Sequence, residues 1–230
     1  MTASLQGISS MATRQVLAEL SAAWKARGGA PVAIESVGGV DAAKRVQAGE
    51  EAFDLVFLAS DAIDKLLASG RAAAGSKVDL MLSSTAVAVR AGTAHPDITS
   101  EDAVRAAVLA APTVGYSTGP SGVALQKLFE RWGIAEEVKA RTVQAPPGVP
   151  VGSLVAQGQV ALGFQQLSEL IHVEGIDIVG PLPAAIAIDT VFSAAVVAGS
   201  PHAEAARQLL AFMASPEAAD AKRRQGMEPA

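Results

Sequence analysis

The chain has 230 residues, half of them hydrophobic, and a formal net charge of −5, so it is long enough to bury one large core or two smaller ones. It has no cysteine, which excludes disulfides, thiolate nucleophiles and cysteine metal sites. The basic residues form no cluster longer than Lys222–Arg224, which argues against a nucleic-acid surface. No apolar run reaches the roughly 18 residues that a membrane span needs, so no span is predicted.

Short apolar runs alternate with segments of helical periodicity, and this order predicts an α/β fold. Most of the runs are continuously apolar, which is typical of strands covered on both faces. Strands are expected at 5–9, 32–36, 54–59, 85–90, 113–117, 160–165, 176–180 and 191–198.

Two helices between these strands show a clear apolar stripe that we assign to the core. Gly133 is expected to end the second of them, and residues 99–102 resemble a capping box that opens a surface helix. The stripes consist of Val16, Leu17, Leu20 and Trp24, and of Leu125, Leu128, Phe129 and Trp132.

Four helices are expected to begin with small residues or proline directly after strands. They start at Ser10 and in the segments VGGVDAAKRV, TGPSGVALQKLF and PPGVPVGSL. Because a helix N-terminus presents free N–H groups and partial positive charge, several of them together predict an anion site. Ordinary capping and turn chemistry is the alternative explanation at each junction.

The order of ISSMATRQVLAEL, SVGGVDAAKRVQAG, FDLVFLASDAIDKLLASG, TAVAVRAG, YSTGPSGVALQKLFERWGI, LVAQGQVALGFQQLSEL and GIDIVGPLP resembles the type II periplasmic-binding-protein fold in its molybdate-binding (ModA-like) branch. The resemblance implies an α/β protein of two lobes, with mostly parallel sheets and two strands that cross between the lobes. Lobe one would comprise residues 1–84 and 190–230, and lobe two residues 85–189. A ligand would be held between the lobes, which would close around it by a hinge motion.

Transferred residue by residue, the resemblance implies a serine ligand at Ser10 and backbone N–H donors at Ser121 and Val151. Gly39 stands where molybdate binders have a second serine, and Gln166 where they have a tyrosine, so molybdate is disfavoured. The expected ligand-binding residues are Ser9, Ser10, Gly38, Gly39, Val40, Arg90, Ser117, Ser121, Gly122, Val151, Gln165 and Gln166.

The paired amides of Gln165 and Gln166 suit carboxylates and hydroxyls. The segments GFQQLSEL and GIDIVGPLP also resemble a sub-branch of the fold that includes aconitate isomerase, which implies a 1,3-proton shift and a positioned acid or base. The candidate catalytic residues are Ser10, Ser117 and Glu169, although Glu169 is explained most simply as a surface carboxylate of a helix.

A tricarboxylate would also need guanidinium or ammonium partners, for which Arg14, Lys44, Arg45 and Arg90 are the candidates. We expect Arg90 to be the best placed of these, at the end of the first crossing strand, with a surface salt bridge as its alternative role. The three histidines share no metal-ligand spacing, so neither a metal nor a cofactor is expected.

Two functions remain open from the sequence. The favoured one is capture of a small anion, carboxylate or oxyanion, as in the substrate-binding component of a molybdate-type ABC transporter, with a permease as a possible partner. The alternative is an isomerase of the aconitate isomerase type. A monomer is expected, located in the cytoplasm if Met1 is native and in the periplasm if a signal peptide was removed.

Overall fold

The computed structural model describes residues 4–49 and 52–230, so Met1, on which the expected compartment depends, lies outside the described residues. The chain divides into two compact units, residues 1–82 with 191–230 and residues 83–190. The chain passes from one unit to the other within β4 (Val78–Arg90) and again within β9 (Asp189–Val196). Over the described residues, no helix combines the length and the apolar character that crossing a membrane requires.

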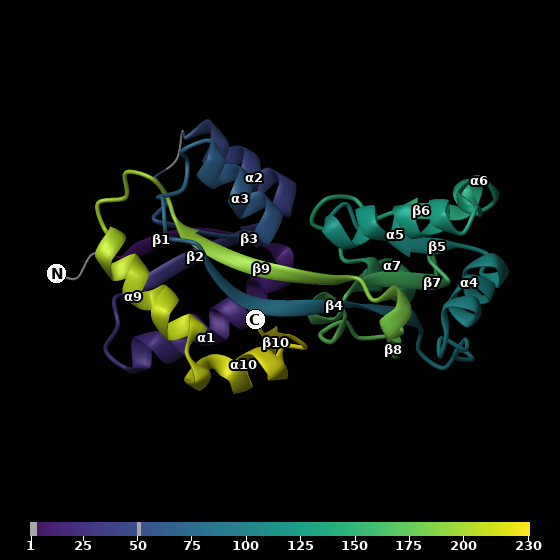
Figure 1. Ribbon diagram of the computed structural model, residues 1–230. Coiled ribbons are helices and arrows are strands. Elements are labelled where there is room, and N and C mark those ends of the chain that lie inside the picture. The colour runs from purple at the N-terminus through teal and green to yellow at the C-terminus, as the bar shows by residue number, and fades with distance from the viewer. Residues whose placement is uncertain (1–3, 50–51) are drawn as a thin grey trace. The chain divides into compact units, whose positions relative to one another are not determined.

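Unit 1 is built on a sheet with the strand order β2-β1-β3-β9 (Figure 1). Strand β1 pairs in parallel with β2 and β3, and β9 runs antiparallel to β3. The elements of this unit are β1 (Leu5–Ser10), η1 (Met11–Thr13), α1 (Arg14–Ala26), β2 (Val32–Val37), α2 (Gly39–Ala48), β3 (Leu55–Ala59), α3 (Ser60–Ala68), α9 (Ala203–Ala214), η4 (Pro216–Ala218), α10 (Ala219–Arg224) and β10 (Glu228–Pro229).

Helices cover both faces of this sheet. On one face α1 and α9 pack through Leu17 and Leu209 against Phe57, and on the other α2 and α3 pack through Val46 and Ile63. This explains why β3 is buried along its whole length, whereas the edge strand β2 is only partly covered.

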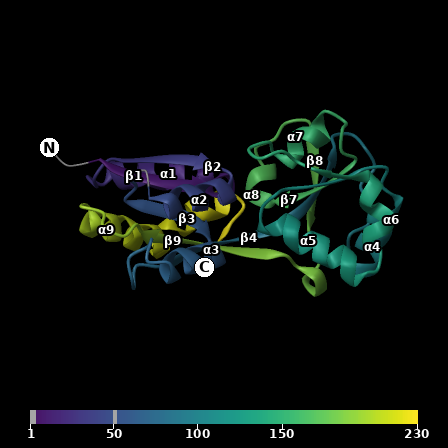
Figure 2. The ribbon, with the colours of Figure 1, turned by 90° about the horizontal axis from the view of Figure 1, so that it is seen from above.

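Unit 2 has its own sheet with the order β4-β7-β5-β6 (Figure 2). Strand β5 is parallel to β6 and β7, while β7 and β8 are both antiparallel to β4. Beside β4, the elements are α4 (Glu101–Ala110), β5 (Val114–Tyr116), α5 (Pro120–Arg131), α6 (Ala135–Val138), η2 (Lys139–Arg141), β6 (Thr142–Gln144), α7 (Val151–Ala156), β7 (Leu162–Gln166), α8 (Leu167–Leu170), β8 (Ile176–Pro181) and η3 (Ala184–Ile186).

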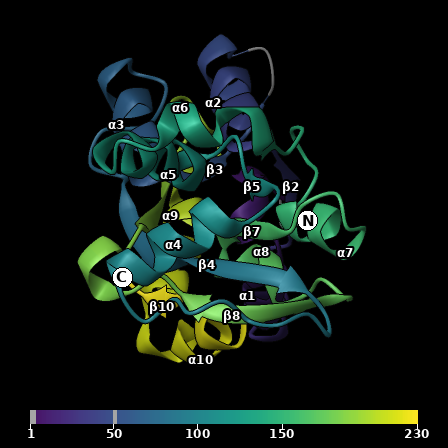
Figure 3. The same ribbon diagram turned by 90° about the vertical axis from the view of Figure 1, so that its right-hand side faces the viewer.

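The core of unit 2 also has helices on both faces of the sheet (Figure 3). Val104 of α4 and Phe129 of α5 pack with Phe164 of β7 in the main cluster. On the other face α7 lies close to β5 and β7, because Gly115 and Gly163 leave room for Val151 and Val155. The α/β prediction and the two-lobed fold class are therefore confirmed.

The local predictions hold with defined exceptions. All eight expected strands are present, but β4 begins seven residues earlier than the expected strand at 85–90, and β6 and β10 were not predicted. Gly133, at φ 68°, follows α5 as expected. The capping residue of α4 is Ser100, whose Oγ accepts from the Ala103 N–H at 3.2 Å, so the expected capping box at 99–102 is off by one residue.

Candidate functional site

Ser10 and Gly39 lie together in unit 1, at the carboxyl ends of β1 and β2. Ser10 is 7% exposed, yet its Oγ has no hydrogen-bond partner and does not cap the helix that follows. A Cβ placed on Gly39 would lie 3.5 Å from the Ser10 Cβ. Because buried hydroxyls are almost always paired, the free Ser10 Oγ indicates a position prepared for a ligand or a water molecule.

The neighbouring predicted residues of unit 1 divide into structural and open groups. Ser9 is fully buried, and its Oγ lies 2.8 Å from the Ser36 Oγ and donates to the Ser10 carbonyl at 3.2 Å, so it fastens β1 to β2. Gly38 precedes α2 without any side-chain cap, and the side chain of Val40 in the first turn is 54% exposed. The start of α2 is therefore uncapped, as an anion site requires.

The loop before α5 brings Ser117 and Ser121 together in unit 2, with their Oγ atoms 3.2 Å apart. The Gly119 N–H also donates to the Ser117 Oγ at 3.3 Å. Gly122 is not an open donor, because its N–H donates to the Gly119 carbonyl. A Cβ on Gly122 would lie 1.8 Å from the Ser117 carbonyl oxygen, so glycine is required there for packing.

Gln165 has a role that the sequence did not predict. Its Oε1 accepts from the N–H groups of Val151 at 2.7 Å and of Gly152 at 3.4 Å, at the start of α7. The Val151 N–H is therefore occupied by the protein itself, which contradicts the prediction of an open backbone donor at Val151. Gln165 is 1% exposed and supplies the cap that Pro150, at the N-cap position, cannot provide.

Gln166 forms a second polar cluster in unit 2 with two threonines. Its Nε2 lies 2.8 Å from the Thr190 Oγ1, while its Oε1 has no partner. Thr85 is the register partner of Gln166 across β4 and β7, and its Oγ1 is also unpaired. Each of these three side chains is buried. The sequence missed both threonines, because nothing in their spacing links them to Gln166.

Glu169 differs most from expectation. Burial raises the pKa of its carboxyl to about 7, opposed only by a hydrogen bond from the Gln165 side chain. Its predicted role as an ordinary surface carboxylate is therefore wrong, since a solvated glutamate would not show this pKa. Gln165 thus joins the start of α7 to a carboxyl group that titrates near neutral pH.

The expected guanidinium partner, Arg90, lies at the wrong end of its strand. In the antiparallel pair of β4 and β7, Thr85 is opposite Gln166, and Arg90 is five residues further along β4, roughly 17 Å away. Arg45 is engaged in a two-pronged ion pair with Glu35 at 2.8 Å. Among the residues that the structure describes, no group of histidine, aspartate and glutamate is arranged to hold a metal ion.

Sequence comparison relates the chain to one family and one enzyme. Residues 5–228 match a family described as bacterial extracellular solute-binding protein. An aconitate isomerase from Pseudomonas sp. is 45% identical over 185 residues, which cover 79% of this chain and 70% of that protein.

Solved structures share the fold at lower identity. The periplasmic molybdate-binding protein of Azotobacter vinelandii superposes with a TM-score of 0.79 at 21% identity, covering 97% of this chain and 98% of the other. The tungstate-binding protein TupA of Desulfovibrio alaskensis G20 gives a TM-score of 0.71 at 16% identity, covering 99% and 98%. These likenesses establish a type II periplasmic-binding-protein fold.

Proposed function

Because the chain belongs to the bacterial extracellular solute-binding protein family, we propose that it binds a small unsaturated polycarboxylate and isomerises it by a 1,3-proton shift. The observation that carries this proposal is the 45% identity to an aconitate isomerase. The fold alone does not choose a function. The second support is Glu169, whose carboxyl provides the acid or base that the sequence appeared to lack.

The ligand groups that we propose come from both units. Unit 1 would contribute the Ser10 Oγ and the first N–H groups of α2 beside Gly39, and unit 2 would contribute Thr85 and Gln166. The support is chemical, because Ser10, Thr85 and Gln166 all carry buried polar atoms without partners. Hydroxyl and amide groups of this kind match carboxylate oxygens and protonated carboxyl groups.

The proposed reaction needs one group that both removes and returns a proton. A C–H bond breaks at one end of the allylic system, the double bond moves, and a C–H bond forms at the other end, so no electrons are gained or lost. A base is most effective when its pKa is near the working pH, which the value of about 7 for Glu169 satisfies. Ser10 and Ser117 would position the substrate by hydrogen bonds, since the Ser117 Oγ pairs with Ser121 and with no base.

The second candidate is capture of an anion for delivery to an ABC transporter permease. It is favoured by the description of the family and by the likeness to molybdate-binding and tungstate-binding proteins. In this case a small carboxylate or oxyanion would bind tightly and leave unchanged. We place it second because the unpaired amide and threonine hydroxyl of unit 2 suit a carboxylate better than a bare oxyanion.

Two measurements on one sample separate these functions. Calorimetry with aconitate, itaconate and molybdate gives the ligand class, and proton NMR of cis-aconitate with the protein follows its conversion to the trans isomer. We expect binding of aconitate and conversion that Glu169→Gln abolishes, while Glu174→Gln, at an exposed carboxylate nearby, leaves it intact. Binding without conversion would establish the capture function, and submicromolar affinity for molybdate with no carboxylate binding would refute the polycarboxylate proposal.

A further inference from the structure

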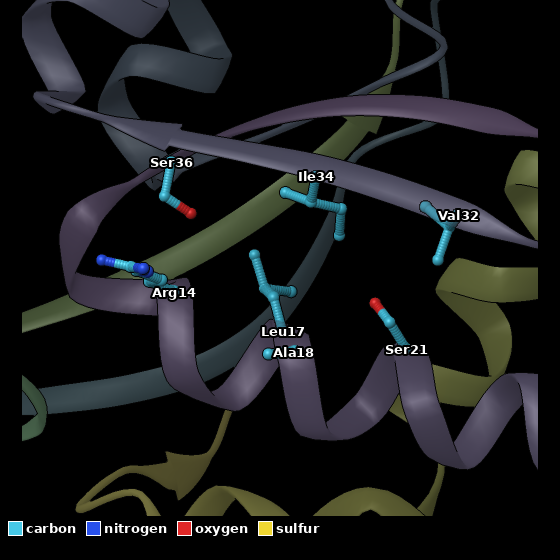
Figure 4. Close-up of a pocket in the computed structure, with 7 residues that line it drawn as sticks. All are labelled: Arg14, Leu17, Ala18, Ser21, Val32, Ile34 and Ser36. Atoms are coloured by element: carbon cyan, nitrogen blue, oxygen red, sulfur yellow. The ribbon is translucent and has the colours of Figure 1, made fainter.

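A groove of about 530 Å³ lies between α1 and the edge strand β2 in unit 1 (Figure 4). Its volume falls within the range of small-molecule sites, roughly 300–1,000 Å³. Figure 4 shows Arg14 and Ser36 at one end, Leu17 and Ile34 in the middle, and Ser21 and Val32 at the other end. The groove is therefore apolar along its length and cationic at one end.

Arg14 is the cation that remains once the other candidates are examined. It is the first residue of α1, and its side chain has no hydrogen bond or ion pair among the described residues. Arg45 is held by Glu35, and Arg90 lies at the far end of β4. The position of Arg14 in the first turn is unfavourable for a cation next to the positive end of a helix, unless an anion binds there.

The cationic end of the groove adjoins Ser10. The Ser36 Oγ in the groove lies 2.8 Å from the Ser9 Oγ, and Ser9 is the residue before Ser10. The turn Met11–Thr13 alone separates Ser10 from Arg14, so about 6–8 Å of helical rise lies between them. Ser10 is also the buried hydroxyl without a partner, which is an independent sign that a ligand reaches this end of unit 1.

We infer that the Arg14 end of this groove is a subsite for the distal carboxylate of the ligand. Arg14 supplies the guanidinium, Ser36 lies beside it, and the apolar wall of Leu17 and Ile34 contacts the carbon chain that joins this carboxylate to the one at Ser10. The inference rests on the proposed function, and it makes unit 1 select ligands with an additional carboxylate over smaller anions. An Arg–carboxylate pair of this kind accounts for selectivity of roughly tenfold to a hundredfold.

The test compares two ligands and two charge-matched variants. Calorimetry gives the affinities of aconitate, with three carboxylates, and itaconate, with two, for the native protein, Arg14→Gln and Lys25→Gln. Lys25 is an exposed cation on the last turn of the same helix, so its removal changes the net charge equally without altering the groove. Melting of each variant in the absence of ligand confirms that folding is unchanged.

We expect Arg14→Gln to weaken aconitate binding by roughly tenfold or more, to change itaconate binding by less than about threefold, and so to remove the preference for the tricarboxylate. Lys25→Gln should leave that preference intact. Equal affinities of the Arg14 and Lys25 variants for aconitate would overturn the subsite while leaving the proposed function standing. A native protein that binds neither carboxylate would instead refute the proposed function, and the subsite with it.

Discussion

Replacing Glu169 by glutamine should stabilise the protein, and only above mildly acidic pH. An unfolded glutamate loses its proton near its ordinary pKa of 4.5, whereas folded Glu169 keeps its proton up to a pKa of about 7. The folded state therefore binds more protons in this window, and the free energy of unfolding of the native protein falls as pH rises from about 4.5 to 7. Glutamine is neutral throughout and can still bond with Gln165.

The size of the effect follows from the two pKa values. At about 1.4 kcal/mol for each pKa unit, raising the pKa from 4.5 to about 7 corresponds to a penalty of about 3 kcal/mol above pH 7. For a chain of 230 residues this predicts a rise in Tm of about 6–12 °C for Glu169→Gln at pH 8. At pH 4.5 the two proteins should differ little, because the native carboxyl is protonated as well.

Thermal melting of both proteins at pH 4.5 and pH 8 measures the difference directly. Glu174→Gln is the matched control, since it removes an exposed carboxylate four residues after α8 and should not alter the pH dependence. A Glu169→Gln variant whose Tm exceeds the native value by the same amount at both pH values would refute the raised pKa. The proposed acid–base role of Glu169 would then lose its physical basis.

Three other substitutions test the site. Ser10→Ala should weaken aconitate binding about tenfold and change the free energy of unfolding by less than about 0.5 kcal/mol, because the Ser10 Oγ has no partner and caps no helix; a large loss of Tm without ligand would be inconsistent with this. Gln166→Ala should cost about 1–3 kcal/mol of folding stability besides affinity, since it leaves Thr190 unpaired, and chemical denaturation that detects no loss would disprove that contact. Gly122→Ala should cost at least about 2 kcal/mol, because its Cβ would meet the backbone oxygen of Ser117; an unchanged Tm would contradict the packing at this turn.

The fold was predictable because its signals are local. Continuous apolar runs such as Leu55–Ala59 indicated buried strands, and the stripe through Leu17 and Leu20 indicated the buried face of α1. The strand β6 was missed because three residues, Thr142–Gln144, give no period to read. The start of β4 was missed because Val78–Ser84 mixes polar and apolar residues while crossing from one unit to the other.

The candidate site was only partly predictable, because several roles depend on contacts between distant parts of the chain. The glutamine pair was correctly singled out, yet only the structure shows that Gln165 caps α7 from 14 residues away. The raised pKa of Glu169 arises from burial, to which the polar segment around it gives no clue. Arg90 was misplaced because a strand has two ends, and the sequence does not say which one lies beside Gln166.

Proton NMR of aconitate in D₂O tests the central claim most directly. If the protein moves a proton along the allylic system, the native protein should convert cis-aconitate to the trans isomer and introduce deuterium at the carbon that receives the proton, to the extent that Glu169 exchanges with solvent. The rate should rise with pH through a pKa near 7, as Glu169 becomes a base, and Glu169→Gln should show neither change. Aconitate that binds but stays unconverted and undeuterated for hours with native protein would contradict the isomerase account.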